Sequence, residues 1–415
     1  MTCRRVVPPL HAAAVAWLTL AAATVAAQTA RPQTAAPLTL AAAVERALAA
    51  NQTLIAARLQ RPVDVAGVDV AGERPNPEVV YEWSKEVPRQ SIGATLPIEL
   101  GGKRQRRLDL ANATVAAGDA DLARVIAEVR NDVRRAYFEV VAADARVQIA
   151  EDVRALAQRA RDAANARVTA GDAPRADLTQ SELALASSDN DLIAARGETV
   201  AARAELNQLL GQPPAEPLAL ADALTAVPLP SEPDALALAS SASTELQVLD
   251  RRILEQTARV NLANSLTTPD ISAGGTFTYD AFPEFRFGWR ATFGITVPLL
   301  STHKAGTRVE ELTLTRLKAE RDAALARIRG TIAAALSRAA AARDQMANYE
   351  RRILPLALES ERLAQAAYDG GQTNLPALVL ALQTARDTRQ RGVQAGLDYT
   401  RALADLERAI GASLR

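Results

Sequence analysis

Apolar residues alternate with polar or small ones in several stretches, most clearly over residues 285–299, FRFGWRATFGITVPL. A period of two is the β-strand period, and it places alternate side chains on opposite faces. The strands predicted in this way span about residues 78–84, 91–100, 270–279 and 285–299. They form two β-hairpins, each with one apolar face and one polar or small-residue face.

Most of the remaining chain has the helical period and contains few helix breakers. The long helices predicted from it span about residues 103–170, 173–210, 304–369 and 374–411, and a shorter one spans 38–61. Gly171 and Gly370-Gly371 interrupt the long helices, so we expect two antiparallel coiled-coil hairpins. A helix of residues 103–170 would be on the order of 100 Å long. Pro355 is expected to kink the third long helix.

The same order of elements occurs twice. Leu54 corresponds to Leu246 192 residues later, and Gly211 corresponds to Gly411. We therefore predict a first repeat over residues 28–210, a proline-rich linker over 211–234 and a second repeat over 235–415. Because the period is near 200 residues, the pattern indicates a duplication and excludes a solenoid of short repeats.

The first 27 residues have the features of an export signal. Arg4 and Arg5 precede an apolar run, and small residues resembling a cleavage site follow it. A mature chain without residues 1–27 would reside in the periplasm or beyond, and it would lack Cys3, the only cysteine. No later segment is apolar enough for a transmembrane helix, so we expect any membrane insertion to use the strands.

The composition of the chain argues against some classes of function and favours others. The 48 basic and 48 acidic residues balance, which argues against a nucleic-acid partner. Only 4% of the residues are aromatic, yet nine aromatic residues lie in the two predicted β-hairpins. The helices use their apolar stripes on one another, so a bilayer is the predicted partner of the apolar strand faces. A soluble sheet covered by another protein layer is the alternative.

This argument assigns faces to the last strand. The predicted lipid-facing residues are Phe285, Phe287, Trp289, Phe293 and Ile295. Arg286 and Arg290 lie on the opposite face, which we expect to line a water-filled lumen. Four strands cannot close a barrel around a lumen, and unpaired strand edges are unfavourable in lipid. We therefore expect several copies of the chain to share one barrel.

These features together resemble the TolC family of outer-membrane efflux ducts, over essentially the whole mature chain. Residues 74–78 (RPNPE), 97–104 (PIELGGKR), 353–357 (ILPLA) and 368–371 (YDGG) resemble its CzcC-like branch, which is associated with heavy-metal cation efflux. The resemblance implies a mainly α-helical homotrimer with a 12-stranded barrel in the outer membrane and an α-helical periplasmic tunnel. It also implies two partners, a periplasmic adaptor and an inner-membrane pump of the resistance-nodulation-division type.

The resemblance assigns adaptor docking to the turns of the two helical hairpins. The residues concerned are Gly171, Asp172, Pro174, Gly370, Gly371, Asn374 and Leu375. Many relatives narrow their entrance with aspartates just after the second turn. The matching positions here are Ala377 and Leu380, which depart from that pattern, whereas the first repeat carries Asp177.

No catalytic, cofactor-binding or metal-binding residues are predicted. The mature chain would contain one histidine, His303, which we expect to cap a helix or line the tunnel. Carboxylate pairs such as Glu151-Asp152 fall on polar helix faces. Without thiolates and with a single imidazole, tight binding of soft metal ions is not expected, so cargo selection is assigned to an upstream partner. A multidrug or type I secretion duct and a soluble periplasmic coiled-coil adaptor are the alternatives.

Overall fold

The computed structural model describes residues 37–283 and 285–414; the predicted signal peptide, with Cys3, lies outside these residues. The helices and strands follow one another in this order: α1 (Leu40–Ala50), α2 (Gln52–Arg58), α3 (Gln60–Gly72), β1 (Glu78–Trp83), β2 (Gln90–Ile98), α4 (Lys103–Ala170), α5 (Arg175–Leu209), α6 (Glu232–Ala242), α7 (Thr244–Ser265), β3 (Asp270–Ala281), β4 (Phe285–Thr296), α8 (Lys304–Asn348), a π-helical turn (Tyr349–Ile353), α9 (Leu354–Asp369) and α10 (Leu375–Ile410).

Helix capping shows the internal duplication at the level of single hydrogen bonds. Thr39 and Ser231, 192 residues apart, are the N-caps of α1 and α6, and each accepts a hydrogen bond from a backbone N–H of the helix that follows it. Asn51 and Ser243 have the same spacing and cap α2 and α7 in the same way. The side chain that follows, Leu54 or Leu246, is buried in each copy. The correspondence of Leu54 and Leu246 thus reflects equivalent positions in two copies of one capped helix.

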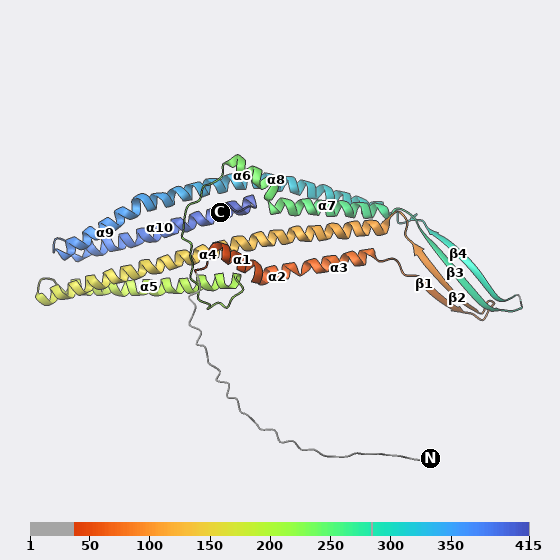
Figure 1. Cartoon of the computed structure of the whole chain (residues 1–415), viewed down its shortest axis with the longest axis horizontal. Coiled ribbons are helices and arrows are strands. Elements are labelled where there is room, and N and C mark those ends of the chain that lie inside the picture. The colour runs from red at the N-terminus through yellow and green to blue at the C-terminus, as the bar shows by residue number, and fades with distance from the viewer. Residues whose placement is uncertain (1–36, 284, 415) are drawn as a thin grey trace, which may run out of the picture. The chain divides into compact units, whose positions relative to one another are not determined.

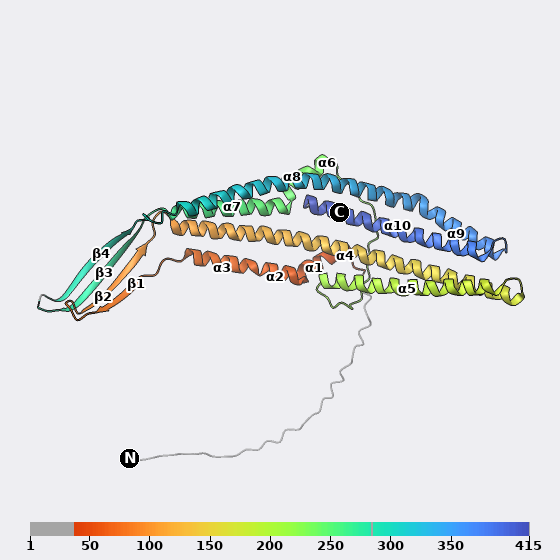
Figure 2. The same cartoon turned by 180° about the vertical axis from the view of Figure 1, so that it is seen from behind.

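Helix α4 is the central element of the helical region. It packs against α3 and α7 toward the sheet, and against α5 and α10 toward its other end. The helices are therefore arranged in two rows that share α4. One row is α3–α4–α7–α8 and the other is α5–α4–α10–α9 (Figures 1 and 2). Helices α3 and α5 lie along one side, and α8 and α9 lie along the other. The side chains buried between the helices are mostly alanine and leucine, and small side chains allow helices to approach closely.

Two buried tyrosines attach the proline-rich linker to the helices. The hydroxyl of Tyr137 on α4 donates a hydrogen bond to the carbonyl oxygen of Leu38 (2.7 Å) and accepts one from the backbone N–H of Asp222 (3.1 Å). Burial raises the pKa of Tyr137. Tyr399 on α10 both donates to and accepts from the backbone of Val227, at 2.9 Å in each case. One tyrosine from each repeat thereby holds the connection between the repeats.

The strands form one antiparallel sheet in the order β1-β2-β3-β4. The two predicted hairpins are therefore joined through β2 and β3, whose register pairs Ile92 with Phe277. Strand β4 ends at Thr296, three residues earlier than predicted. Val297 is followed by Pro298, which has no backbone N–H to continue the hydrogen-bond ladder of the sheet. The alternation of apolar and polar residues in the sequence therefore extends beyond the last paired residue of the strand.

The predicted helix over residues 38–61 was wrong in its extent and continuity. Helices α1, α2 and α3 extend to Gly72 and are separated at Asn51 and Leu59. Asn51 accounts for the first break, because its side chain caps α2 and its backbone is extended. The third long helix contains the π-helical turn immediately before Pro355, which lies in the first turn of α9. Proline has no backbone N–H, so the regular α-helical hydrogen bond cannot form at Pro355, and a π-helical turn accommodates this missing bond.

A buried ion pair joins the two repeats where the sheet meets the helices. The Nζ of Lys103, the first residue of α4, lies 2.6 Å from Oδ2 of Asp270 and donates to the carbonyl oxygen of Thr268 (2.9 Å). The Lys103 side chain is only 8% exposed, against 35% for Asp270. The lysine therefore depends on these two oxygen atoms for its hydrogen bonds.

We expect the change Lys103→Met to lower the free energy of unfolding by about 1–3 kcal/mol, because it leaves partly buried acceptors without a donor. Thermal unfolding of the purified protein would measure this loss. The double-mutant cycle with Asp270→Asn isolates the pair. Strictly additive effects would show that Lys103 and Asp270 do not stabilise each other.

Among the described residues, no helix combines the length and the apolar character needed to cross a membrane.

Candidate functional site

One face of the sheet carries apolar side chains on all four strands. The register aligns Tyr81, Ile92, Phe277 and Trp289 in one row. A second row contains Ile98, Ile271 and Ile295. Trp289 is 74% and Phe293 83% exposed, and the three other residues predicted to face lipid, Phe285, Phe287 and Ile295, are exposed as well. The structure thus brings all five onto one face, and no described part of a single copy covers it.

The opposite face of the sheet carries threonine, serine, glycine and charged residues. Arg290 is paired with Thr276, and Gly93 and Val80 continue the same row. Arg286 lies between Phe285 and Phe287 along β4 and therefore faces the same way as Arg290. The two arginines predicted to line a lumen share the polar face of the sheet.

The turns of the helical hairpins end their helices by different means. Helix α4 ends at Gly171, whose φ of 83° lies in the left-handed region, and α9 is followed by Gly371 with φ 72°. The side chain of Asn374 accepts a hydrogen bond from the backbone N–H of Ala377 (3.2 Å) and caps α10. Pro174 occupies the capping position of α5 and makes no side-chain hydrogen bond there.

The two turns differ in what they expose. Six of the predicted docking residues are on the surface: Gly171, Asp172, Pro174, Gly370, Gly371 and Asn374. Leu375, the seventh, is completely buried beside Tyr368 and Leu378, so its assignment to a docking surface was wrong. It begins α10 with its side chain in the core of the hairpin, where it can hold the turn in place. The guanidinium of Arg167 on α4 lies 5.4 Å from the ring centre of Tyr368, a cation–π contact between the two hairpins.

Four further positions lie near the hairpin turns or near the end of the sheet. Asp177 lies in the first turn of α5. Ala377 and Leu380 are exposed on α10, where many family members carry acids. His303 precedes α8 with a φ of 56°, and its side chain makes no capping hydrogen bond. His303 thus occupies the capping position of α8, where its backbone carbonyl and not its side chain accepts a hydrogen bond, from the backbone N–H of Thr307.

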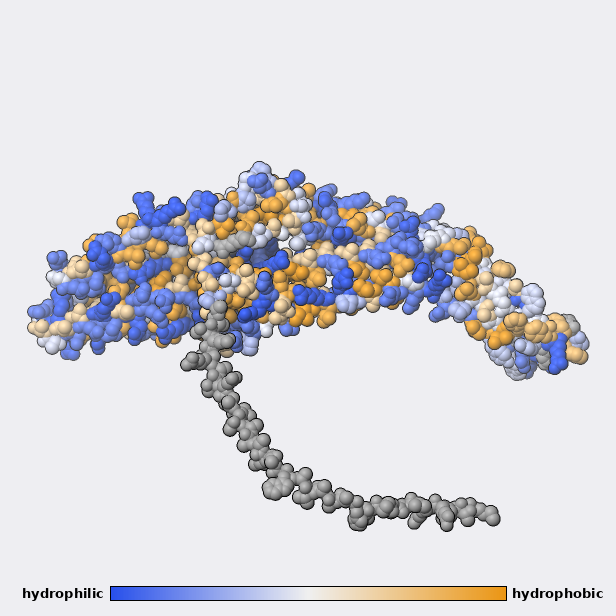
Figure 3. Space-filling view, in the orientation of Figure 1, coloured by the Kyte–Doolittle hydropathy of each residue, from blue (hydrophilic) through white to orange (hydrophobic). Residues whose placement is uncertain are grey.

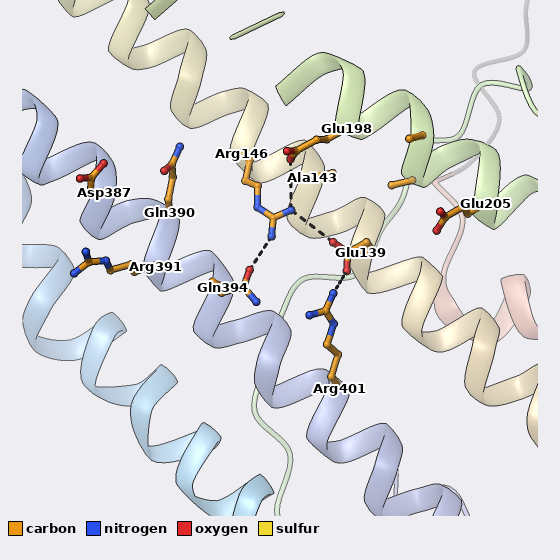
Figure 4. A pocket seen from close by; sticks show the side chains of 12 residues that line it. Glu139, Ala143, Arg146, Glu198, Glu205, Asp387, Gln390, Arg391, Gln394 and Arg401 are labelled. Atoms are coloured by element: carbon orange, nitrogen blue, oxygen red, sulfur yellow. Dashed lines mark hydrogen bonds and ion pairs between the residues drawn. The ribbon is translucent and has the colours of Figure 1, made fainter. Parts of the chain in front are cut away.

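A charged groove of about 860 Å³ lies between α4, α5 and α10 (Figure 4). Arg146 on α4 donates to the side-chain oxygen of Gln394 on α10 (2.9 Å) and lies 3.6 Å from Glu139. Glu139 in turn accepts from Arg401 at 2.6 Å. Pairs of arginine and carboxylate side chains therefore lie along the groove and connect the two helical hairpins.

The same kind of bridge recurs closer to the hairpin turns. Arg386 on α10 donates to Asp191 on α5 (2.6 Å), and Arg389 donates to Glu361 on α9 (2.8 Å). These contacts were missed in the sequence, because each charged residue belongs to an ordinary polar helix face. Only the side-by-side placement of α5, α9 and α10 distinguishes these ion pairs from solvated charges.

No group of three or more His, Cys, Asp or Glu side chains in the described part of the chain is arranged to hold a metal ion. Carboxylates between the helices are engaged instead by arginine, as Glu139 in the groove and Asp191 nearer the turns show. The arrangement therefore provides three kinds of surface. They are an apolar sheet face, a polar sheet face, and two exposed turns at the ends of long helices.

The chain resembles known proteins in both sequence and fold. Residues 43–212 match the family model described as "Outer membrane efflux protein". The chain is 32% identical over 245 residues to the cobalt-zinc-cadmium resistance protein CzcC of Cupriavidus metallidurans. That alignment covers 56% of each chain, so it spans little more than half of this relative's length.

Solved outer-membrane channels share the fold over nearly the full length. The outer-membrane channel OprN has a TM-score of 0.74 at 19% identity, with 90% of both chains covered. The open state of the MtrE outer membrane channel of Neisseria gonorrhoeae also has a TM-score of 0.74 at 19% identity, covering 91% of this chain and 89% of the other. Residues 43–212 therefore match the outer membrane efflux protein family, and the chain has the fold of the TolC-like channels that its sequence resembles.

Proposed function

We propose that this protein is the exit duct of a tripartite efflux system. Three copies form a 12-stranded barrel in the outer membrane and an α-helical tunnel in the periplasm. A periplasmic adaptor and an inner-membrane pump of the resistance-nodulation-division type deliver the cargo to the tunnel. Heavy-metal cations are the proposed cargo, and the duct provides a hydrated path without transforming what passes.

The observation that carries this proposal is the apolar sheet face combined with unpaired sheet edges. Trp289 and Phe293 are among the most exposed large side chains of the molecule. A contiguous apolar surface of this kind marks contact with another protein or with lipid. The polar face behind it, with Arg286 and Arg290, suits water, so the two faces together favour the wall of an aqueous pore.

The hairpin turns support adaptor docking at the opposite end of α4 from the sheet. Gly171 and Gly371 end helices in the left-handed conformation, with open space where a side chain would be. Exposed turns at the ends of long paired helices give a partner a backbone surface to approach closely. We assign these turns to the adaptor, with Leu375 as an internal support of the second turn.

The proposed cargo rests on the relative named for resistance to cobalt, zinc and cadmium. A duct of this architecture for drugs or secreted proteins is the competing function. A soluble coiled-coil adaptor is disfavoured, because it would leave the apolar face of the sheet in water.

Deletion of the gene is expected to lower the tolerated concentration of zinc, cobalt or cadmium several-fold, with the tolerance of a drug panel unchanged. Growth inhibition by each compound measures this, and the wild-type gene on a plasmid restores resistance. Sensitivity to drugs alone would contradict the metal assignment. Recovery of the protein as a soluble monomer without detergent would contradict the duct itself.

A further inference from the structure

A small cavity lies between the two helical hairpins, close to the turns where the hairpins end. It is bounded by α4, α5 and α10 and has a volume of about 50 Å³. Helix α4 packs against both of the other helices and so keeps α5 and α10 apart. Apolar and charged side chains are interspersed along the surface of the helices in Figure 3. The lining of the cavity differs from that surface, because it is mostly apolar.

Short side chains on α4 and α5 account for the empty space. Ala157 of α4 lines the cavity and is buried, as are Ser181 and Ser188 of α5. On the other side, α10 contributes Leu375 and Leu382, which are buried as well. Alanine and serine side chains are too short to reach across to the leucines of α10. The three helices therefore leave a volume between them that no side chain fills.

The polar groups of the lining are already engaged. The hydroxyl of Ser181 donates to the carbonyl oxygen of Leu178 (2.8 Å), and that of Ser188 donates to the carbonyl oxygen of Leu185 (2.7 Å). Arg386, which also lines the cavity, donates to an aspartate of α5 (2.6 Å). A buried water molecule needs roughly two to four polar partners, whereas an apolar cavity stays dry and binds apolar molecules. The lining therefore favours an alkyl group over water or an ion.

We propose that this cavity binds the short alkyl end of a small apolar or amphiphilic molecule. The alkyl group contacts α5 on one side and α10 on the other, where it gains the packing contacts that the empty space lacks. Because α5 belongs to the first hairpin and α10 to the second, the bound molecule holds the two hairpins together beside their turns. The binding itself is independent of transport. An effect on efflux rests on the proposed function, which assigns these turns to the adaptor.

A thiol placed in the cavity makes the binding measurable on the detergent-purified full chain. The only cysteine, Cys3, lies in the predicted signal peptide, so Ser188→Cys would give the processed protein a single thiol. It should react with propyl methanethiosulfonate about tenfold or more faster than with the trimethylammonium-ethyl reagent, because the cavity accepts an alkyl group and excludes a charge. Intact mass spectrometry measures both rates, each normalised to the rate of that reagent with a free thiol.

Thr199→Cys is the matched control on the same helix. Thr199 is buried and donates its hydroxyl to a carbonyl oxygen of its own helix (3.1 Å), but it does not line the cavity. This variant should react slowly with both reagents. The double variant Ser188→Cys/Ala157→Leu fills the cavity and should slow the propyl reagent to the rate of the control. Equal normalised rates of the two reagents at Ser188→Cys, or no slowing by Ala157→Leu, would overturn the proposed site.

The attached group also tests whether binding holds the hairpins together. Ser188→Cys carrying the propyl group should unfold at a higher temperature than the same variant carrying a methyl group, which is too short to reach α10. Equal midpoints of thermal unfolding would contradict the contact with α10. A chain that discriminates the reagents but forms no pore would contradict the proposed function alone. A functional duct that does not discriminate them would contradict the cavity proposal alone.

Discussion

Replacing Trp289 with arginine should abolish assembly in the outer membrane. Trp289 lies on the outer strand β4, at the end of the apolar row that contains Phe277, and it is 74% exposed in a single copy. If this face meets lipid, an arginine near the middle of the bilayer costs about 2–4 kcal/mol in every copy. The measurement is the amount of oligomer in the outer-membrane fraction, from electrophoresis of samples that are not heated.

The matched control is Thr292→Arg on the same strand. Thr292 is exposed like Trp289 but lies on the polar face, opposite Gly274. An arginine there would join Arg290 in the proposed lumen and should leave assembly close to wild type. Equal assembly of the two variants would show that the apolar face does not meet lipid, and it would favour a sheet covered by protein.

The change Gly371→Val is expected to abolish efflux while the oligomers still reach the outer membrane. Gly371 has a φ of 72°, and a Cβ there would meet no other atom within 4 Å. The substitution therefore acts through the backbone, where a left-handed residue with a side chain costs about 1–2 kcal/mol. The turn would move away from this conformation and lose the surface offered to the adaptor. Metal tolerance and membrane oligomer are measured in the same cells.

Gly102→Val provides the control for backbone strain. Gly102 has a φ of 70° and equally open surroundings, but it lies next to the sheet and not at a hairpin turn. The two variants incur the same kind of strain, and only the one at the turn should lose efflux. Loss of efflux in both would indicate general destabilisation, and normal efflux in Gly371→Val would remove this turn from the docking surface.

The strand faces could be predicted from local pattern alone. Alternation in the order Phe285, Arg286, Phe287 assigns neighbouring residues to opposite faces whatever the strand later pairs with. The positions of the long helices and their turns also followed from local signals, since glycines such as Gly171 and Gly371 end helices by their own backbone freedom. What these features share is that each depends on residues close together in the chain.

The sequence by itself thus determined the two repeats, the faces of the strands and the glycine turns. The tertiary structure alone decided that Leu375 is buried and that Lys103 meets Asp270. It also decided that Arg386 of the second repeat reaches Asp191 of the first. The physical reason is distance along the chain. These contacts join segments 100 or more residues apart, or they depend on which helix lies alongside. The periodicity of a sequence contains no information about which elements become neighbours.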